Sequence, residues 1–170
     1  MLSSAYVSGV TDFDTYTASA FTTLSGGGSF NIWYSAANVL TGNFDFNLGG
    51  AYSIESFALW NDPQSAGQGV NSFTLLAASD AAFTTPTVLG SYSAVEGLGN
   101  ANTAQVFTFA PTTASYVRVQ IVSNHGSTFV TGISEAAFEV SAVPEAETYT
   151  MLLAGLGLVG FAARRRNQHR

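Results

Sequence analysis

Short runs of alternating hydrophobic and polar residues recur between turn signals along most of the chain. In one of them, Phe44, Phe46 and Leu48 alternate with polar residues before Gly49-Gly50. Successive side chains of a β-strand point to opposite faces, so this run predicts a strand with one buried face. The same reasoning predicts further strands over residues 52–60, 70–78, 87–93, 104–109, 115–123 and 129–140.

The spacing of these runs predicts the fold class. Before residue 143, no segment shows a helical period over about ten or more positions. About seven or eight strands, spaced about 10 to 18 residues apart, are typical of an all-β antiparallel sandwich or jelly roll. The connections at 61–69 and 94–103 are rich in Gly and Asn and are predicted to be surface loops. We therefore expect one β-sandwich domain over residues 1–142.

The pattern changes in a tail that covers residues 143–170. An apolar run at 149–163 carries no charge, and the cluster Arg164, Arg165 and Arg166 follows it directly. As a helix, the run spans about 22 Å, whereas the hydrocarbon core of a bilayer is about 30 Å thick. A C-terminal apolar helix that crosses a membrane marginally, with the arginines on the cytoplasmic side, fits this pattern. The alternative is an amphipathic or core-packed helix that closes the sandwich.

The tail has three parts in a fixed order. The motif Pro144-Glu145-Ala146 comes first, then a short spacer and the apolar run LLAGLGLVGFAA, and then the arginine cluster. This order resembles the PEP-CTERM sorting signal of Gram-negative bacteria, except that Ala146 stands where the signal usually has Pro. The resemblance implies export, transient membrane insertion and recognition by an exosortase near Pro144-Glu145. Release or transfer to the cell surface would follow.

The charge balance limits the partners that the body can bind. Only 9% of the residues are charged, and the whole chain has a formal net charge of -6. Up to Val143, nine carboxylates stand against one basic residue, Arg118, which gives a net charge of about -8. Such a surface repels phosphate backbones, so we expect no nucleic-acid binding.

Two further absences concern cross-links and export. The chain has no Cys, so disulfides and thiolate metal sites are excluded. The first residues, MLSSAYVSGVTDF, lack the positive and apolar regions of a secretory signal peptide. Because PEP-CTERM proteins normally begin with a signal peptide, we expect the natural start to lie upstream of Met1.

Signals of catalysis are weak, and we expect a protein that is not an enzyme. His125 is the only His before the tail, and no G-x-S-x-G elbow accompanies it, so a turn residue is the simpler interpretation. Asp12 and Asp14 are two positions apart, which does not give carboxylates facing each other across a cleft. The glycines at 26–28 lack the context of a phosphate loop. A hydrolase is therefore the least favoured class.

Aromatic side chains beside amide and carboxylate groups are more informative. Flat rings next to such groups suit carbohydrate binding, because sugars present apolar ring faces and hydroxyl rims. Buried core positions are the alternative for the two Trp residues. The candidate ligand-binding residues are Trp33, Tyr34, Trp60, Asn61, Asp62 and His125.

Four segments carry a second resemblance: FDFNLGGAYSIESFALWND, GQGVNSFTLLAASDAAF, ASYVRVQIVSNHG and GISEAAFEV. Their order and wording are similar to discoidin-like domains (coagulation factor 5/8 type C, galactose-binding-like) over most of residues 30–140. The resemblance implies a jelly roll whose end loops bind glycans or other surface ligands, often with a structural calcium ion. Glu135 matches a carboxylate that helps to hold the calcium, although a surface or strand-edge carboxylate is the alternative. Arg118 matches a recurrent Arg, for which we expect a structural ion pair.

Two functional hypotheses follow. The first is a non-enzymatic module, exported to the cell envelope or extracellular matrix, whose end loops bind polysaccharide. The second is a structural matrix or surface protein without a specific small ligand, whose hydroxyl-rich surface serves solubility or glycosylation.

Overall fold

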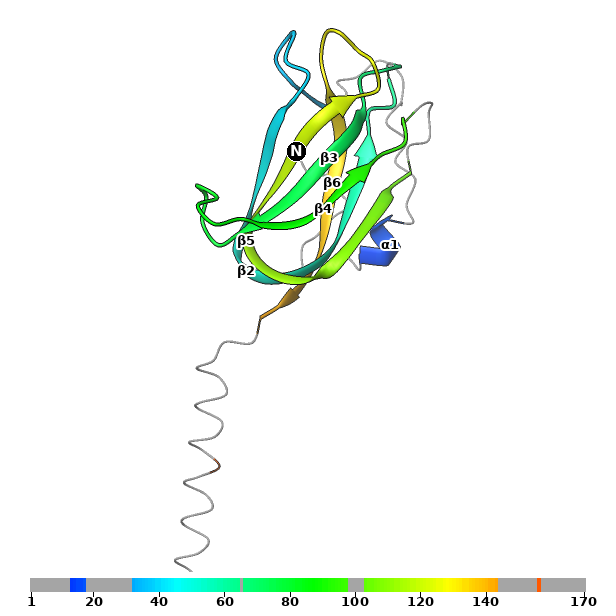
Figure 1. The fold of residues 1–170 in the computed structure, drawn as a ribbon. Coiled ribbons are helices and arrows are strands. Elements are labelled where there is room, and N and C mark those ends of the chain that lie inside the picture. The colour runs from blue at the N-terminus through cyan, green and yellow to red at the C-terminus, as the bar shows by residue number, and fades with distance from the viewer. Residues whose placement is uncertain (1–12, 18–31, 65, 98–102, 144–155, 157–170) are drawn as a thin grey trace, which may run out of the picture.

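A computed structural model describes residues 13–17, 32–64, 66–97, 103–143 and 156 of the chain. Within these ranges, six strands form one antiparallel sheet in the order β1-β6-β2-β5-β3-β4 (Figure 1). The predicted all-β antiparallel fold is confirmed. The elements are α1 (Phe13–Thr17), β1 (Trp33–Tyr34), β2 (Gly42–Asn61), β3 (Val70–Ala78), β4 (Thr87–Ser93), β5 (Gln105–Asn124) and β6 (Gly132–Ala142).

Two long strands, β2 and β5, run through both halves of the sheet. The first part of β2, residues 42–47, pairs with the second part of β5, which also pairs with β3. The second part of β2, residues 52–61, pairs with β6, and most of it also pairs with the first part of β5. The rings of Phe46 and Phe138 lie 5.0 Å apart between centroids, so the two halves face each other and enclose a core. The sheet is thus folded on itself as a sandwich.

The long strands correct part of the sequence prediction, which divided each of them into two. In β2, Gly49 has a φ of 78° and lies where the pairing with β5 shifts register, between Asn47 and Tyr52. In β5, Pro111 lies between the paired residues Thr108 and Thr112, at a second register shift. Gly with positive φ and Pro without an N–H are tolerated at such irregularities, so the strands continue through them.

The other predicted strands agree better with the structure. The runs at 70–78 and 87–93 coincide with β3 and β4, and the run at 129–140 contains most of β6. The short helix α1 and the two-residue strand β1 were not predicted.

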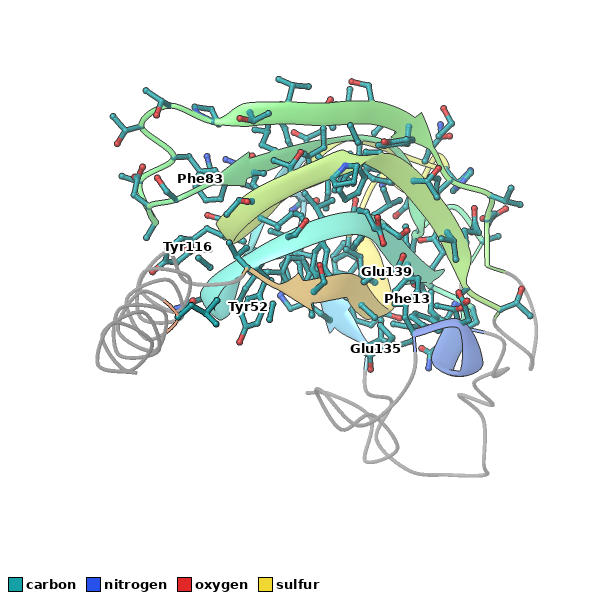
Figure 2. All side chains as sticks on the ribbon, turned by 90° about the horizontal axis from the view of Figure 1, so that it is seen from below. Phe13, Tyr52, Phe83, Tyr116, Glu135 and Glu139 are labelled. Carbon is teal, nitrogen blue, oxygen red and sulfur yellow. The ribbon has the colours of Figure 1, made fainter. Side chains whose placement is uncertain are left out.

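Two apolar clusters stabilise the described part of the chain. The larger one lies inside the sandwich, where Phe57 and Phe73 are 0% and 1% exposed and their ring centroids are 5.8 Å apart. Each such side chain contributes about 1.5–3 kcal/mol by leaving water. The smaller cluster lies on the other face of β2 and β6, where Phe13 of α1 packs against Trp60 and Ala137 (Figure 2).

Arg118 makes the structural ion pair that the sequence analysis expected. Its Nε and Nη2 atoms each donate a hydrogen bond of 2.7 Å to Asp45, one to each carboxylate oxygen. Its guanidinium carbon also lies 4.1 Å from the centroid of the Phe83 ring. The hydrogen bonding to Asp45 raises the pKa of Arg118.

Candidate functional site

Three loops meet at the end of the sandwich where β6 begins, opposite the end where it leads out to Val143 (Figure 1). The loop between β5 and β6 donates backbone hydrogen bonds from His125 N–H to Gly69 O at 3.1 Å and from Ser127 N–H to Gly67 O at 3.0 Å. The loop between β1 and β2 joins the same group through Asn38 N–H, which donates to Phe129 O at 2.6 Å. These loops therefore hold one another in place.

Asn61, at the end of β2, fixes the base of these loops. Its Nδ2 donates hydrogen bonds of 2.7 Å to Val70 O and 2.9 Å to Val95 O, and its Oδ1 accepts one of 2.7 Å from Val70 N–H. A Cβ atom on Gly69 would lie 2.7 Å from Asn61 Oδ1, so the close approach requires glycine there. Asp62 Oδ1 accepts a 2.8 Å bond from Gln64 N–H and shapes the loop that follows.

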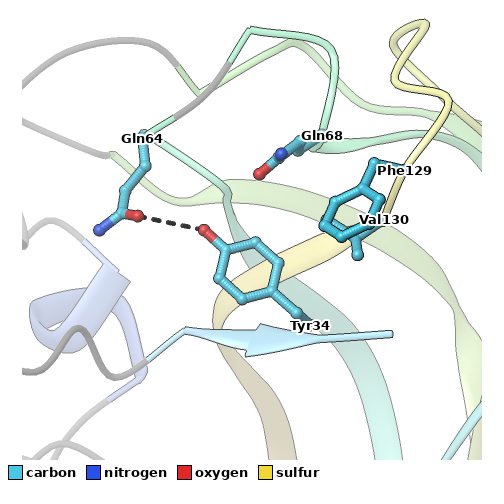
Figure 3. Close-up of a pocket in the computed structure, with 5 residues that line it drawn as sticks. All are labelled: Tyr34, Gln64, Gln68, Phe129 and Val130. Carbon is cyan, nitrogen blue, oxygen red and sulfur yellow. Dashed lines mark hydrogen bonds between the residues drawn. The ribbon is translucent and has the colours of Figure 1, made fainter. Parts of the chain in front are cut away.

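A pocket of about 340 Å³ lies between these loops and β1 (Figure 3). The Tyr34 hydroxyl donates a 3.2 Å hydrogen bond to Gln64 Oε1, and the Phe129 side chain is 58% exposed. The pocket thus combines two aromatic rings with side-chain amides, which can both donate and accept hydrogen bonds. Its lining residues are Tyr34, Gln64, Gln68, Phe129 and Val130, and we call it the Tyr34–Phe129 pocket.

Burial, together with the negative charge of Asp62 close by, raises the pKa of Tyr34 to about 12. Tyr34 therefore stays protonated through the whole range of ordinary pH. In this state its hydroxyl can act as a hydrogen-bond donor and as an acceptor but carries no charge.

Comparison with known families decides which family the chain belongs to. The family model described as F5/8 type C domain matches residues 7–136, which is most of the chain. The chain belongs to the F5/8 type C domain family. The predicted discoidin-like resemblance is thereby confirmed. No curated protein matches the chain.

Solved structures are similar to this F5/8 type C domain in fold. The C-terminal domain of a chitobiase from Bacteroides fragilis has 18% identity and a TM-score of 0.54, over 66% of this chain and 74% of that chain. The CBM32 of AlyQ, in complex with 4,5-unsaturated mannuronic acid, has 24% identity and a TM-score of 0.52, over 69% and 83%. The family 32 CBM of Clostridium perfringens NanJ, in complex with galactose, has 18% identity and a TM-score of 0.51, over 69% and 81%.

The tail that follows the F5/8 type C domain also matches a known pattern. Residues 142–166 match the model of the PEP-CTERM protein-sorting motif, which confirms that resemblance. The predicted motif Pro144-Glu145-Ala146, the Arg164-to-Arg166 cluster and the membrane run at 149–163 lie outside the described residues, apart from Leu156. Among the residues that the structure describes, no helix is long and apolar enough to cross a membrane.

Three of the predicted ligand-binding residues lie inside this F5/8 type C domain and not at its surface. Trp60, Asn61 and Asp62 are all 0% exposed. Trp60 cannot stack on a sugar because it packs in the apolar cluster beneath Phe13 of α1. The amide of Asn61 and the Oδ1 atom of Asp62 form hydrogen bonds with nearby backbone groups instead of facing solvent. These residues support the site from beneath.

The other predicted ligand-binding residues lie at the surface of the domain but not in one place. Tyr34 lines the pocket, whereas Trp33, on the opposite face of β1, lines a different cleft and is 39% exposed. His125 is half-buried in the loop that carries Phe129 and is not among the pocket-lining residues. Its Nε2 has no hydrogen-bond partner within the described ranges.

Glu135, the predicted calcium ligand, lies in β6 of this F5/8 type C domain, and the structure does not confirm that prediction. Glu135 pairs with Trp60 across β6 and β2, and its Oε1 accepts a 3.2 Å hydrogen bond from Ala136 N–H. No group of three or more His, Cys, Asp or Glu side chains converges within the described ranges.

Sequence reasoning missed four of the five pocket residues. Gln64 and Gln68 lie in the loop NDPQSAGQG, and Phe129 was assigned to the start of a strand. Two amides within a Gly-rich loop directly after a strand were the available signal. The contact of this loop with Phe129 depends on long-range packing that the local pattern does not contain.

Proposed function

We propose that this F5/8 type C domain binds an uncharged glycan in the Tyr34–Phe129 pocket and does not catalyse a reaction. The observation that carries this proposal is the exposed ring of Phe129 beside the amides of Gln64 and Gln68, in a hollow that the loops preform. An aromatic ring can stack on the apolar face of a sugar, while amides exchange hydrogen bonds with its hydroxyls.

Charge favours an uncharged ligand over an acidic one. Arg118 is the only basic residue before the tail, and Asp45 occupies its guanidinium. Asp62 lies close enough to Tyr34 to raise the pKa of that side chain. A carboxylate, sulfate or phosphate in the pocket would therefore meet negative potential without a partner cation from residues 1–143.

The chemistry of the pocket favours binding over catalysis. Amide groups do not titrate, and Tyr34 has a pKa of about 12, so neither exchanges protons readily near neutral pH. Sugars are the bound molecules in two of the similar structures, galactose in one and 4,5-unsaturated mannuronic acid in the other. Both ligands support a sugar as the class of ligand, and of the two only galactose is uncharged, since mannuronic acid carries a carboxylate.

A glycan array followed by titration calorimetry tests the proposal. The Phe129→Ala variant is expected to lose about tenfold or more in affinity, because central aromatic anchors carry much of the binding energy at such sites. Val88→Ala in β4, which removes an exposed apolar side chain on a different strand, is the matched control and should bind like the wild type. Equal affinity of both variants, or preferential binding of acidic glycans, would refute it.

We also propose that the tail directs the protein to the cell envelope of a Gram-negative bacterium, where an exosortase processes it. The match of residues 142–166 to the PEP-CTERM motif supports this. In this scheme the run at 149–163 enters the membrane transiently, the arginine cluster stays on the cytoplasmic side, and the domain reaches the cell surface or the medium. Mass spectrometry of protein recovered from the cell surface should find a C-terminus near Pro144-Glu145. An intact tail on that protein would argue against processing.

One observation favours a second candidate function, that of a structural surface protein without a specific ligand. Hydroxyl groups pair with one another along neighbouring strands: Ser72 Oγ lies 2.6 Å from Ser123 Oγ, and Thr74 Oγ1 lies 2.9 Å from Ser91 Oγ. An uncharged, hydroxyl-rich surface of this kind could serve solubility or carry glycosylation. The absence of saturable binding to every envelope glycan on the array would favour this candidate over the first.

A further inference from the structure

Trp33 is a partly exposed aromatic ring with a firm support beneath it. Its ring packs against Phe44 with 4.8 Å between centroids, and Phe44 packs against Phe46 at the same distance. Phe46 in turn contacts Phe138, a residue of the core. These tilted and edge-to-face ring contacts fix the orientation of the Trp33 ring, while 39% of the residue stays exposed. A fixed, exposed ring can bind a flat apolar face with little loss of conformational entropy.

A cleft of about 280 Å³ opens beside this ring, and we call it the Trp33 cleft. Ser35 Oγ donates a 2.6 Å hydrogen bond to Val39 O and accepts one of 2.9 Å from Thr131 N–H. Thr131 Oγ1 donates a 2.8 Å bond to Leu40 O. These hydroxyls are already hydrogen-bonded within the protein. Much of the surface that a ligand would meet in the cleft is therefore apolar, and it comes from the indole ring and from side chains such as Val39, Leu40 and Ile121.

The Trp33 cleft and the Tyr34–Phe129 pocket share a wall. Trp33 and Tyr34 are successive residues of β1, and successive side chains of a strand point to opposite faces. In the neighbouring segment, just before β6, Thr131 lines the cleft and Val130 lines the pocket. The backbones of the two segments are joined by a 2.9 Å hydrogen bond from Ser35 N–H to Thr131 O. The backbone of these two segments forms the ridge between the two hollows.

We propose that the Trp33 cleft is a second sugar-binding subsite, which holds another unit of the glycan chain that occupies the Tyr34–Phe129 pocket. The inference rests on the proposed function, and the adjacency of the two hollows, which are lined by neighbouring residues of the same two segments, argues for one ligand that reaches both. The Trp33 ring stacks on the apolar face of one sugar unit while the chain crosses the ridge. The domain therefore recognises a stretch of several units along an uncharged polysaccharide, and not a single terminal sugar.

This arrangement makes affinity depend on chain length. A monosaccharide fills the Tyr34–Phe129 pocket alone, whereas a longer oligosaccharide places a second unit at Trp33 with a high effective concentration. Affinity should therefore rise by about tenfold or more once the chain is long enough to cross the ridge.

The test is calorimetric titration of the full chain with neutral oligosaccharides of one to six units, in galactose, glucose and N-acetylglucosamine series. Trp33→Ala is expected to lower hexasaccharide affinity about tenfold and to leave monosaccharide affinity within about twofold. Val39→Ala, which trims the same cleft, should show a weaker form of the same pattern, and Val88→Ala on β4 should show none. Emission from the buried Trp60 verifies that each variant is folded.

Acrylamide quenching provides a second readout on the unmodified protein. Trp60 is 0% exposed, so the quenchable emission comes from Trp33. A bound hexasaccharide should protect this emission from acrylamide, and a bound monosaccharide should not. If affinity is independent of chain length and Trp33→Ala binds all lengths normally, the second subsite is refuted while the proposed function stands. If the wild type binds none of the three series, both are refuted.

Discussion

Replacing Asn61 with alanine removes the side chain that joins the end of β2 to the start of β3 and to the segment after β4. The amide makes hydrogen bonds of 2.7 Å and 2.9 Å to Val70 O and Val95 O, and it accepts bonds of 2.7 Å from Val70 N–H and 3.2 Å from Asp62 N–H. Asn61 is 0% exposed, so water cannot readily replace these partners. The substitution is expected to destabilise the fold strongly.

The magnitude follows from the bonds that are lost. Each is worth about 1 kcal/mol net, and a buried N–H such as that of Val70, left without its acceptor, costs about 1–3 kcal/mol. We therefore expect Asn61→Ala to lower the free energy of unfolding by about 3–5 kcal/mol. This is a large share of the about 5–15 kcal/mol that stabilises an ordinary domain.

Urea unfolding, followed by the emission of the buried Trp60, measures this loss. With a slope of about 2 kcal/mol/M, the midpoint should fall by about 2 M. Asn43→Ala is the matched control, because Asn43 is an exposed amide of the same strand and should change stability by no more than about 0.5 kcal/mol. Coincident unfolding curves for the two variants would show that the Asn61 bonds contribute little, and the reasoning would fail.

Three further outcomes are expected. Gly69→Ala should destabilise the fold by about 1–3 kcal/mol in the same urea assay, since its Cβ would lie 2.7 Å from Asn61 Oδ1; wild-type stability would disprove the clash. The pKa of Tyr34 is raised by burial from 10.0 to about 12, so its contribution to stability is complete below pH 10 and is lost as pH rises from 10 to 12. Tyr34→Phe should remove that part of the pH dependence, and ultraviolet titration of the wild type should show one tyrosine ionising late. Arg118→Met should lower the free energy of unfolding by at most about 1 kcal/mol at low salt and by less at high salt, because the ion pair with Asp45 is partly exposed. A loss of stability that does not depend on salt would indicate another role for Arg118.

The sequence predicted the strand content well wherever a strand is bounded by clear turns. Residues 70–78 and 87–93 became β3 and β4 because alternation and turn residues agree at both ends. The same turn residues predicted strand ends at Gly49-Gly50 and Pro111, but these residues lie inside the long strands β2 and β5, at register shifts. A local pattern cannot distinguish a turn from a bulge, because the difference is the continued pairing with a distant partner strand.

The candidate site was only partly predictable for a related reason. Tyr34 and Trp33 were selected because of their residue type, and both lie beside hollows at the surface. Trp60 was selected on the same grounds, but it is buried in an apolar cluster against which Phe13, far away in the chain, packs. Residue type indicates what a side chain can bind, whereas burial decides whether it is accessible, and burial here depends on contacts between remote segments.

The direction of β6 has a mechanical consequence. This strand begins next to Val130 at the ligand end of the sandwich and ends at Ala142, directly before the sorting tail. Under the proposed function, a pull between a glycan held in the Tyr34–Phe129 pocket and a membrane or matrix that holds the tail would act along this strand. The antiparallel ladder between β6 and β2 then resists in shear, with its hydrogen bonds sharing the load at once instead of opening one by one. The fold is therefore suited to hold under tension between two attachment points.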